Sequence, residues 1–321
     1  MQQRSLGPDG PTVGAIGFGA MVLSPGIYGD VDDDQAAATL RRAVELGVTL
    51  FDTANVYGAG HNETLLGRAL GPVRDDVILS TKVGLTLDAQ GVPAGVDGRP
   101  ESLRAAARAS LRRLGTDRID LLYLHRPDPA VPIEESIGAL AALVAEGCVR
   151  FLGVSGVTVE QLHAADAVRP IAAVQNEYSL WTRDPEQDGV AEACEQIGAA
   201  LVCYSPLGAG FLAGAVTGAD DLDAGDFRRM LPRFQRENLR RNQDRFAPLR
   251  AIAADRGVHP AQLALAWLLA RGRTTIPIPG TRDQRHLETN VAAAEIELTQ
   301  HELAAIGQAA PAGLAAGTRP F

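Results

Sequence analysis

The chain has 321 residues, of which 46% are hydrophobic and 21% charged, and its formal net charge is -9 at pH 7. This composition is typical of a globular protein with a large core, and the length allows two domains or one α/β barrel. The acidic balance and the absence of a clustered basic face argue against nucleic-acid binding, and no apolar run approaches the ~18 residues of a membrane helix.

Cysteine and histidine usage narrows the class further. The three cysteines are scattered without a C-x-x-C pair, and the six histidines form neither H-x-x-x-H nor H-E-x-x-H. We therefore expect reduced thiols and no metal site. Residues 1–14 lack the apolar segment of a signal peptide, so we expect a soluble, cytoplasmic protein without membrane or nucleic-acid partners.

Eight short apolar runs alternate with amphipathic segments along the chain. Most are nearly continuous apolar runs rather than strict alternations, which is typical of strands buried on both faces of a parallel sheet. The predicted strands are residues 12–19, 48–54, 77–84, 119–125, 149–156, 171–179, 199–207 and 274–280.

The segments between these runs have helical patterns. Residues 32–47 begin with three acids, which suit the positive end of a helix dipole, and stop at Gly47. Residues 100–115 and 132–147 each begin at a proline and end at a glycine. Asn62 is expected to cap another helix. Strand and helix repeated eight times with short loops predict one (β/α)₈ TIM barrel over residues 1–321. The remaining predicted helices are residues 158–168, 185–198, 259–272 and 298–310.

The connection between the seventh and eighth strands is anomalous. It spans residues 208–273, whereas a whole βαβ unit needs only ~30 residues. We expect a loop followed by at least two helices, and a Pro- and Gly-containing tail after residue 310. Gly208 to Ala213, "GAGFLA", formally matches a G-x-G-x-x-G/A dinucleotide fingerprint. Because Pro206 precedes it and a loop follows, we interpret that match as fortuitous.

Reactive side chains recur where consecutive strands end. The second strand leads to Asp52 and then Tyr57, the third presents Lys82, and the fourth ends at His125. Each alone has an ordinary structural explanation, such as a turn cap or a buried histidine. Because barrel enzymes place their chemistry at the C-terminal ends of the strands, the four together predict an active site.

These four groups suit proton donation to a carbonyl oxygen. An ammonium beside a phenol stabilises the phenolate, so Lys82 makes Tyr57 a better general acid. Asp52 would keep Lys82 charged and oriented, and His125 would donate a hydrogen bond to the substrate oxygen. With no Cys or Ser nucleophile and no metal pattern in evidence, a hydride carrier is the natural complement.

Several longer motifs carry a family resemblance. "FDTANVYG", "STKVG", "LLYLHRPD", "GVSG", "VQNEYS", "YSPLGAGFLAG" and "IPIPGTR" occur in the order found in aldo-keto reductases, across essentially the whole chain. The chain resembles that family, and most of all its perakine reductase-like branch of bacterial and plant aldehyde or ketone reductases. The resemblance implies a TIM barrel, NADPH-dependent carbonyl reduction, and Asp52, Tyr57, Lys82 and His125 as a catalytic tetrad with Tyr57 as the proton donor.

The resemblance also implies a cofactor site. Ser155 and Gln175 would bind the nicotinamide carboxamide, and Tyr204 would stack on the ring. The chain departs from the family pattern at Gly156, where an asparagine is common, and at Ala209, where an arginine is common; Thr289 and His286 are also unusual. The resemblance implies NADPH as the cofactor, and these departures leave NADH possible. The pyrophosphate would lie against Ser205, Pro206, Leu207, Gly208, Gly210 and Leu212, and the adenosine end against Gly280, Thr281, Arg282, His286 and Asn290, with Arg282 on the 2′-phosphate.

The resemblance implies a small carbonyl compound as the substrate. Met21, Tyr28, Trp181 and the C-terminal tail are candidates to line its pocket, which would favour apolar or aromatic compounds. Two alternatives stay open: a cofactor-binding regulatory subunit resembling potassium-channel β-subunits, and a natural-product biosynthetic enzyme with an unusual redox step. The sequence leaves the substrate, the stereochemistry and the oligomeric state open.

Overall fold

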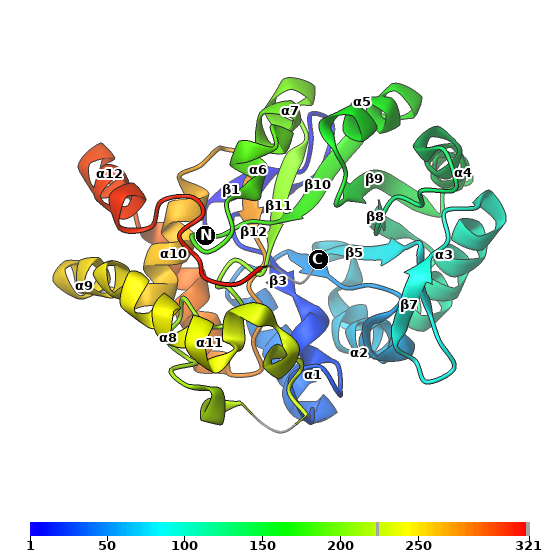
Figure 1. The fold of residues 1–321 in the computed structure, drawn as a ribbon. Helices are drawn as coiled ribbons and strands as arrows, with labels where there is room; N and C mark the ends of the chain where they lie inside the picture. Colours follow the sequence, from blue (N-terminus) through cyan, green and yellow to red (C-terminus); the bar gives the residue numbers. More distant parts are fainter. Residues whose placement is uncertain (223–224, 319–321) are drawn as a thin grey trace.

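A parallel sheet of eight strands forms the centre of the molecule, with helices around it (Figure 1). The computed structural model describes residues 1–222 and 225–318. Neighbouring strands are β3, β4, β5, β8, β9, β10, β11 and β12 in that order, and every pairing among them is parallel. Their bounds are β3 (Phe18–Gly19), β4 (Leu50–Asp52), β5 (Ile78–Val83), β8 (Ile119–Leu124), β9 (Val149–Ser155), β10 (Ile171–Glu177), β11 (Ala200–Tyr204) and β12 (Thr275–Pro277).

The first and last strands of the sheet meet. The Gly17 N–H donates to the Pro277 carbonyl at 3.0 Å. A Cβ atom at Gly19 would lie 2.6 Å from the Ile278 carbonyl oxygen, so only glycine permits this approach. Closure of the sheet confirms the predicted (β/α)₈ barrel.

The prediction for the first strand was wrong in its extent. Residues 12–19 were expected to form one strand, but β2 (Thr12–Gly14) pairs antiparallel with β1 (Gln3–Ser5), and the barrel strand is only β3. Leu6 and Val13 of this hairpin region belong to the apolar cluster inside the barrel, so the hairpin closes one end. A continuous apolar run cannot show where the chain leaves the hairpin and enters the barrel, since both are buried.

The helices cover the outside of the sheet, and the larger apolar cluster fills the layer between them. In chain order the helices up to the seventh strand are α1 (Asp33–Glu45), α2 (His61–Leu70), α3 (Pro100–Leu114), α4 (Ile133–Ala145), α5 (Val159–Val168), α6 (Asp184–Gln187) and α7 (Val190–Ile197). Each of the six regions before the seventh strand where a helix was predicted contains one, and the predicted helix 185–198 is divided into α6 and α7. No helix of the described residues has the length and apolarity to cross a membrane.

The prediction that Asn62 caps α2 was wrong. Asn62 lies inside the helix, and the N-cap is Gly60 in a left-handed conformation with φ of 95°. The Asn62 amide is fully buried and donates to the Ala20 carbonyl at 2.8 Å and to Ser24 Oγ at 2.9 Å. A polar residue at the start of a helix can cap it or link it to a neighbouring segment, and here it links α2 to the loop after β3.

A hairpin that was not predicted follows β5. It pairs β6 (Leu85–Leu87) antiparallel with β7 (Pro93–Val96). The turn at Gly91 approaches Ala59, in the 3₁₀ turn Tyr57–Gly60. The hairpin therefore lies at the same end of the barrel as the loop that carries Tyr57.

The long seventh connection contains helices, as predicted. They are α8 (Arg236–Arg245) and α9 (Ala247–Arg256), drawn in yellow in Figure 1, and they precede α10 (Pro260–Leu269). After β12 come α11 (Gln284–Ala292) and α12 (Gln300–Ala309). The tail returns to α8, where the Asn242 side chain binds both backbone polar groups of Ala316, at 2.7 and 3.0 Å. Residues 319–321 of the predicted tail lie outside the described residues.

Candidate active site

The four predicted catalytic residues lie together at one end of the barrel. Asp52 ends β4, Lys82 lies near the end of β5, His125 follows β8, and Tyr57 begins the 3₁₀ turn after β4. Lys82 Nζ is 2.5 Å from Asp52 Oδ1 and 3.4 Å from the Tyr57 hydroxyl. The Tyr57 and His125 rings meet edge to face, with centroids 6.2 Å apart. The parallel strands thus deliver all four side chains to one rim.

The Lys82 ammonium is buried and fully engaged. It is 1% exposed, and its third acceptor is the Thr53 carbonyl at 2.7 Å. Burial alone would lower the pKa of Lys82, but the charge of Asp52 and the adjacent Tyr57 outweigh it and raise that pKa above its ordinary value. Lys82 is therefore a fixed positive charge beside the phenol.

Asp52, on β4, is held by side chains from two other strands, β5 and β10. Its Oδ2 atom accepts from Ser80 Oγ at 2.8 Å and from the Gln175 side-chain amide at 2.9 Å. Gln175 was predicted to bind a cofactor carboxamide, and in the structure its amide nitrogen supports the carboxylate. Ser80 was missed, although its place two residues before Lys82 puts it on the same strand face. Both oxygens of Asp52 are satisfied, which fixes the acceptor for Lys82.

The imidazole of His125 is neutral near pH 7. Its side chain is buried, with 8% exposure. Burial, reinforced by the charges of Lys82 and Arg126, lowers the pKa of His125 well below its ordinary value. Nδ1 is buried and has no hydrogen-bond partner among residues 1–222 and 225–318. A neutral ring carries one N–H, so it can donate one hydrogen bond to a ligand.

A second group of side chains lies beside His125. Ser155, at the end of β9 and 1% exposed, accepts a hydrogen bond from Arg126 Nη1 at 2.6 Å. Arg126 Nη2 lies 3.5 Å from the hydroxyl of Tyr204, which ends β11. Ser155 and Tyr204 were predicted for the cofactor, and Arg126 was missed. The signal was its position directly after His125 in "LHRPD".

The loop after β11 has an unusual backbone. Ser205, Gly208, Ala209 and Gly210 all have positive φ angles, of 48°, 57°, 52° and 93°. The predicted donors at Gly208, Gly210 and Leu212 close turns within the loop, at 2.9 to 3.1 Å. The loop is therefore shaped by its own hydrogen bonds before any ligand contact, and Pro206 and Leu207 lie at its start.

Trp181 supports this loop. The indole is 5% exposed, stacks on Phe211 with centroids 4.3 Å apart, and contacts Phe234 edge to face. A Cβ atom at Gly208 would lie 2.4 Å from the indole. Trp181 was predicted to line the substrate pocket, and in the structure most of its surface is used in packing beneath the loop.

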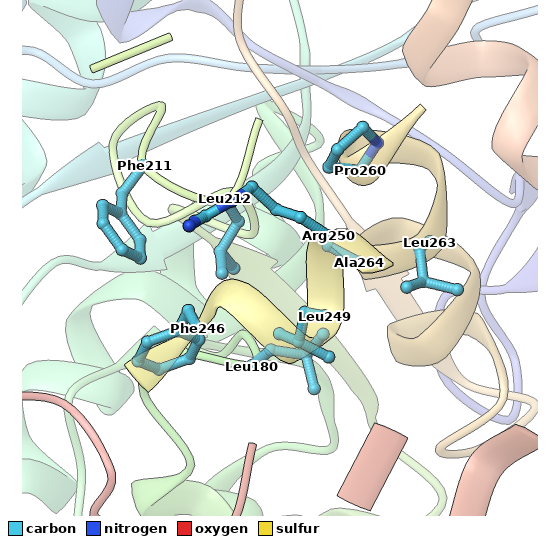
Figure 2. A pocket seen from close by; sticks show the side chains of 9 residues that line it. All are labelled: Leu180, Phe211, Leu212, Phe246, Leu249, Arg250, Pro260, Leu263 and Ala264. Atoms are coloured by element: carbon cyan, nitrogen blue, oxygen red, sulfur yellow. The ribbon is translucent and has the colours of Figure 1, made fainter. Parts of the chain in front are cut away.

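A small apolar cavity lies behind the same loop, as Figure 2 shows. Phe211 and Leu212 face residues of α9 and α10 across it, and its volume is about 20 Å³. That volume suits one water at most and no organic ligand. The cavity marks where the loop packs on the helices, away from Lys82 and Tyr57.

The seventh connection also contacts the loop after β3. Arg228 pairs with Asp226 at 2.6 Å, donates to the Ala209 carbonyl at 2.9 Å, and lies over the Tyr28 ring. Tyr28 meets Phe227 edge to face at 5.0 Å. Of the two predicted substrate residues here, Tyr28 lies in this contact, and Met21 lies in the 3₁₀ helix Ala20–Leu23.

The predicted adenosine end is largely engaged with the protein itself. Arg282 donates to the Tyr28 and Asp30 carbonyls at 2.9 and 2.7 Å. Asp283 caps α11, and its Oδ1 accepts from the backbone N–H groups of Arg285 and His286. A carboxylate thus occupies the helix N-terminus directly after Arg282, the residue predicted to bind the 2′-phosphate. Nearby, Gly280 touches the β3 backbone, Thr281 Oγ1 accepts from the Asp283 N–H, and Asn290 is buried on α11.

Comparison with known proteins decides the family. Residues 15–311 match the model of the aldo/keto reductase family. The chain belongs to this family. A protein named probable aldo-keto reductase 1, from Glycine max, is 39% identical over 100% of this chain and 92% of its own length. Membership makes the chain an oxidoreductase of the class that reduces carbonyl compounds with a nicotinamide cofactor. The narrower resemblance to a perakine reductase-like branch stays a prediction.

Two solved structures of the aldo/keto reductase family show the same fold. The glycerol dehydrogenase AKR11B4 from Gluconobacter oxydans has a TM-score of 0.86 and 30% identity, covering 96% of this chain and 94% of that chain. The holo form of the aldo-keto reductase AKR11C1 from Bacillus halodurans has a TM-score of 0.79 and 27% identity, covering 98% and 97%. This likeness over nearly whole chains agrees with a closed barrel that includes the seventh connection.

Proposed function

We propose that the protein reduces an aldehyde or ketone to an alcohol with NADPH, and that Tyr57 is the general acid. The observation that carries this proposal is the position of Lys82 Nζ, 2.5 Å from Asp52 Oδ1 and 3.4 Å from the Tyr57 hydroxyl. A buried ammonium in that place stabilises a phenolate, which makes the phenol an effective proton donor.

The four residues divide the proton chemistry among them. The substrate oxygen would lie between the Tyr57 hydroxyl and Nε2 of the neutral His125, which donates a hydrogen bond. The nicotinamide cofactor supplies the hydride that adds to the carbonyl carbon. As the C=O π electrons move to oxygen, Tyr57 gives its proton to that oxygen, and Lys82 stabilises the phenolate left behind. Asp52 keeps Lys82 charged throughout.

The residues next to the tetrad suit a nicotinamide ring. Ser155 offers a nearly fully buried hydroxyl, and Arg126 adds guanidinium donors between Ser155 and Tyr204. Glycines at 208 and 210 let the backbone of the next loop approach a pyrophosphate closely. We propose that Tyr204 would hold the face of the nicotinamide ring and that Ser155 would hold its carboxamide.

The preference for NADPH over NADH rests on a balance of charges. Arg282 and Arg285 supply cations near the start of α11, and Asp283 supplies an anion between them. Two cations against one carboxylate favour a 2′-phosphate, so NADPH is the proposed cofactor and NADH the weaker one. The small carbonyl substrate would enter beside Met21 and Tyr28.

The test is cofactor oxidation against a panel of aldehydes, ketones and sugars, followed by nicotinamide absorbance and repeated with NADH. We expect turnover with at least one class of carbonyl compound and a higher kcat/KM for NADPH. Tight NADPH binding with no turnover across the panel would contradict the proposal. Capture of one specific protein partner by such an inactive protein would instead support a regulatory subunit.

A further inference from the structure

Arg126 crosses from the end of β8 to the ends of β9 and β11. Its Nη1 atom donates to Ser155 Oγ at 2.6 Å and to the His125 carbonyl at 2.9 Å, and its Nη2 atom lies 3.5 Å from the Tyr204 hydroxyl. The side chain is only partly exposed. The guanidinium thus bridges two strands beside the tetrad and holds a defined position.

Gly156 leaves the space that this guanidinium occupies. Gly156 has a φ of +63°, and a Cβ atom there would lie 2.9 to 3.0 Å from Cδ, Nε and Nη1 of Arg126. Any larger side chain at position 156 would have to displace the arginine. The glycine and the arginine therefore form a matched pair, in which the missing side chain supplies the space that the guanidinium fills.

Within the described part of the chain, the charge of Arg126 has no anionic partner. Among residues 1–222 and 225–318, no carboxylate oxygen lies within 4.0 Å of its guanidinium nitrogens. Lys82 is paired with Asp52, and the lowered pKa of His125 leaves its ring neutral. Glu177, at the end of β10, accepts from Thr182 at 2.8 Å instead of binding Arg126. Arg126 therefore places a positive charge between Ser155 and Tyr204, with no carboxylate of the described residues in contact with it.

We propose that Arg126 makes the protein discriminate between the two redox states of its cofactor. This inference rests on the proposed function, in which Tyr204 would hold the face of the nicotinamide ring and Ser155 its carboxamide. The guanidinium would donate a hydrogen bond to the carboxamide oxygen in both redox states. Its charge would repel only the oxidised ring, which is a cation, so the reduced cofactor binds more tightly and the oxidised one dissociates faster.

Ser155 takes part in this arrangement through its hydroxyl hydrogen. Because Ser155 Oγ accepts the hydrogen bond from Arg126, its own O–H points elsewhere and is available to donate. Ser155 and Arg126 then offer two donors in a fixed relation to one carboxamide oxygen. The binding groups would be preorganised before the cofactor arrives, which reduces the entropy lost on binding.

The size of the effect follows from Coulomb's law. Two unit charges about 6 Å apart at an effective dielectric constant of about 20 change an equilibrium constant roughly 100-fold, and full screening by water leaves only about threefold. Since Arg126 is partly exposed, we expect an intermediate value of about tenfold. The other contacts of the dinucleotide are the same in wild type and variant, so they cancel when the ratios of the two dissociation constants are compared.

The test compares the ratio Kd(NADP⁺)/Kd(NADPH) in wild type, Arg126→Gln and Arg126→Lys, measured by calorimetric titration of the full chain. Glutamine keeps a donor without the charge, and lysine keeps the charge. We expect the ratio to fall about tenfold in Arg126→Gln and to change less than threefold in Arg126→Lys. The same change is expected for the NAD⁺/NADH pair, because the difference lies in the ring.

Two outcomes distinguish a failure of this proposal from a failure of the proposed function. An unchanged ratio in Arg126→Gln, with both nucleotides still bound, overturns the role of Arg126 and leaves the proposed function standing. Failure of the wild type to bind either nucleotide overturns the proposed function itself. Gly156→Asn gives an independent check, because asparagine tolerates a positive φ and its side chain would displace the guanidinium. The ratio of dissociation constants should fall in this variant as well. An unchanged ratio in Gly156→Asn would also contradict the proposal.

Discussion

Two buried aspartates on barrel strands, Asp52 and Asp120, show how similar groups serve different ends of the molecule. Both are nearly inaccessible, with exposures of 3% and 0%. Asp120 lies at the start of β8 and forms ion pairs with arginines, Arg74 at 2.7 Å, Arg150 at 3.1 Å and Arg118 at 3.6 Å. Asp52 lies at the end of β4 and pairs with one lysine.

The difference lies in what the cation can do next. The arginines around Asp120 contact backbone carbonyls and other acids, so their charge only joins segments at the base of the barrel. The Lys82 ammonium shares its hydrogens between Asp52 and the Tyr57 hydroxyl, a group that can lose a proton. A buried ion pair can therefore assist proton transfer where its cation contacts an ionisable group, as Lys82 contacts Tyr57.

Lys82→Met should have the largest effect because it removes the charge at the functional end. The variant leaves Asp52 buried without a cation, which costs on the order of 3 kcal/mol of the free energy of unfolding. It also leaves Tyr57 without its stabilising charge, so we expect kcat for carbonyl reduction to fall by about 10³ or more. Steady-state kinetics and urea unfolding measure the two effects; kcat within tenfold of wild type would contradict the assignment.

Asp120→Asn applies the same kind of change to the base of the barrel. Asparagine keeps one oxygen to accept from the Leu79 N–H but removes the counter-charge of the three arginines. Because these arginines are partly exposed, we expect a loss of about 2 kcal/mol in the free energy of unfolding. The kcat of the folded fraction should stay within twofold of wild type. A large loss of kcat without loss of stability would contradict the purely structural role of Asp120.

His125 gives a pH dependence to the functional end. Its pKa is lowered in the folded protein, while in the unfolded chain it is about 6.5. As the pH falls below about 6.5, the unfolded chain binds a proton that the folded state does not, so stability decreases by up to ~1.4 kcal/mol per pH unit. His125→Gln has no titrating group at this position, so this loss of stability with falling pH is absent. Urea unfolding at pH 7 and pH 5.5 should show about 1 kcal/mol more loss in wild type than in the variant; equal losses would mean that His125 titrates normally.

Asp283→Asn should have the smallest effect and concerns the cofactor preference. The pKa of Asp283 lies near 2 because Arg285 hydrogen-bonds to its carboxylate, so it is an anion at neutral pH. Asparagine keeps the helix cap without the charge. We expect the ratio of kcat/KM for NADPH to that for NADH to rise about threefold, since repulsion of a 2′-phosphate is removed. Asp75→Asn, at the base of the barrel, is the matched control and should leave this ratio unchanged.

The sequence predicted the arrangement of strands better than the contacts across the barrel. Asp52, Lys82 and His125 each end an apolar run, and parallel strands necessarily bring such positions to one rim, so the grouping followed from order along the chain. The contact of Gln175 with Asp52 joins β10 to β4, and it depends on side-chain direction inside the closed sheet. No local pattern encodes that direction.

Two further differences have local causes. The prediction of the first strand was wrong because its apolar residues are buried in two different places, Val13 in a hairpin and Phe18 in the barrel. Arg126 was missed because an arginine after a strand usually faces solvent. Only the positive φ of Gly156 and the space beside it show that the guanidinium turns inward over Ser155.

The central claim, that Lys82 prepares Tyr57 to donate a proton, is tested most directly by single-turnover reduction with Tyr57→Phe. The phenylalanine ring keeps the packing against His125 and removes only the hydroxyl. The account predicts a decrease of 10² to 10⁴ in the rate of cofactor oxidation, with the Kd for NADPH within threefold of wild type. A rate within threefold of wild type at full NADPH occupancy would contradict it.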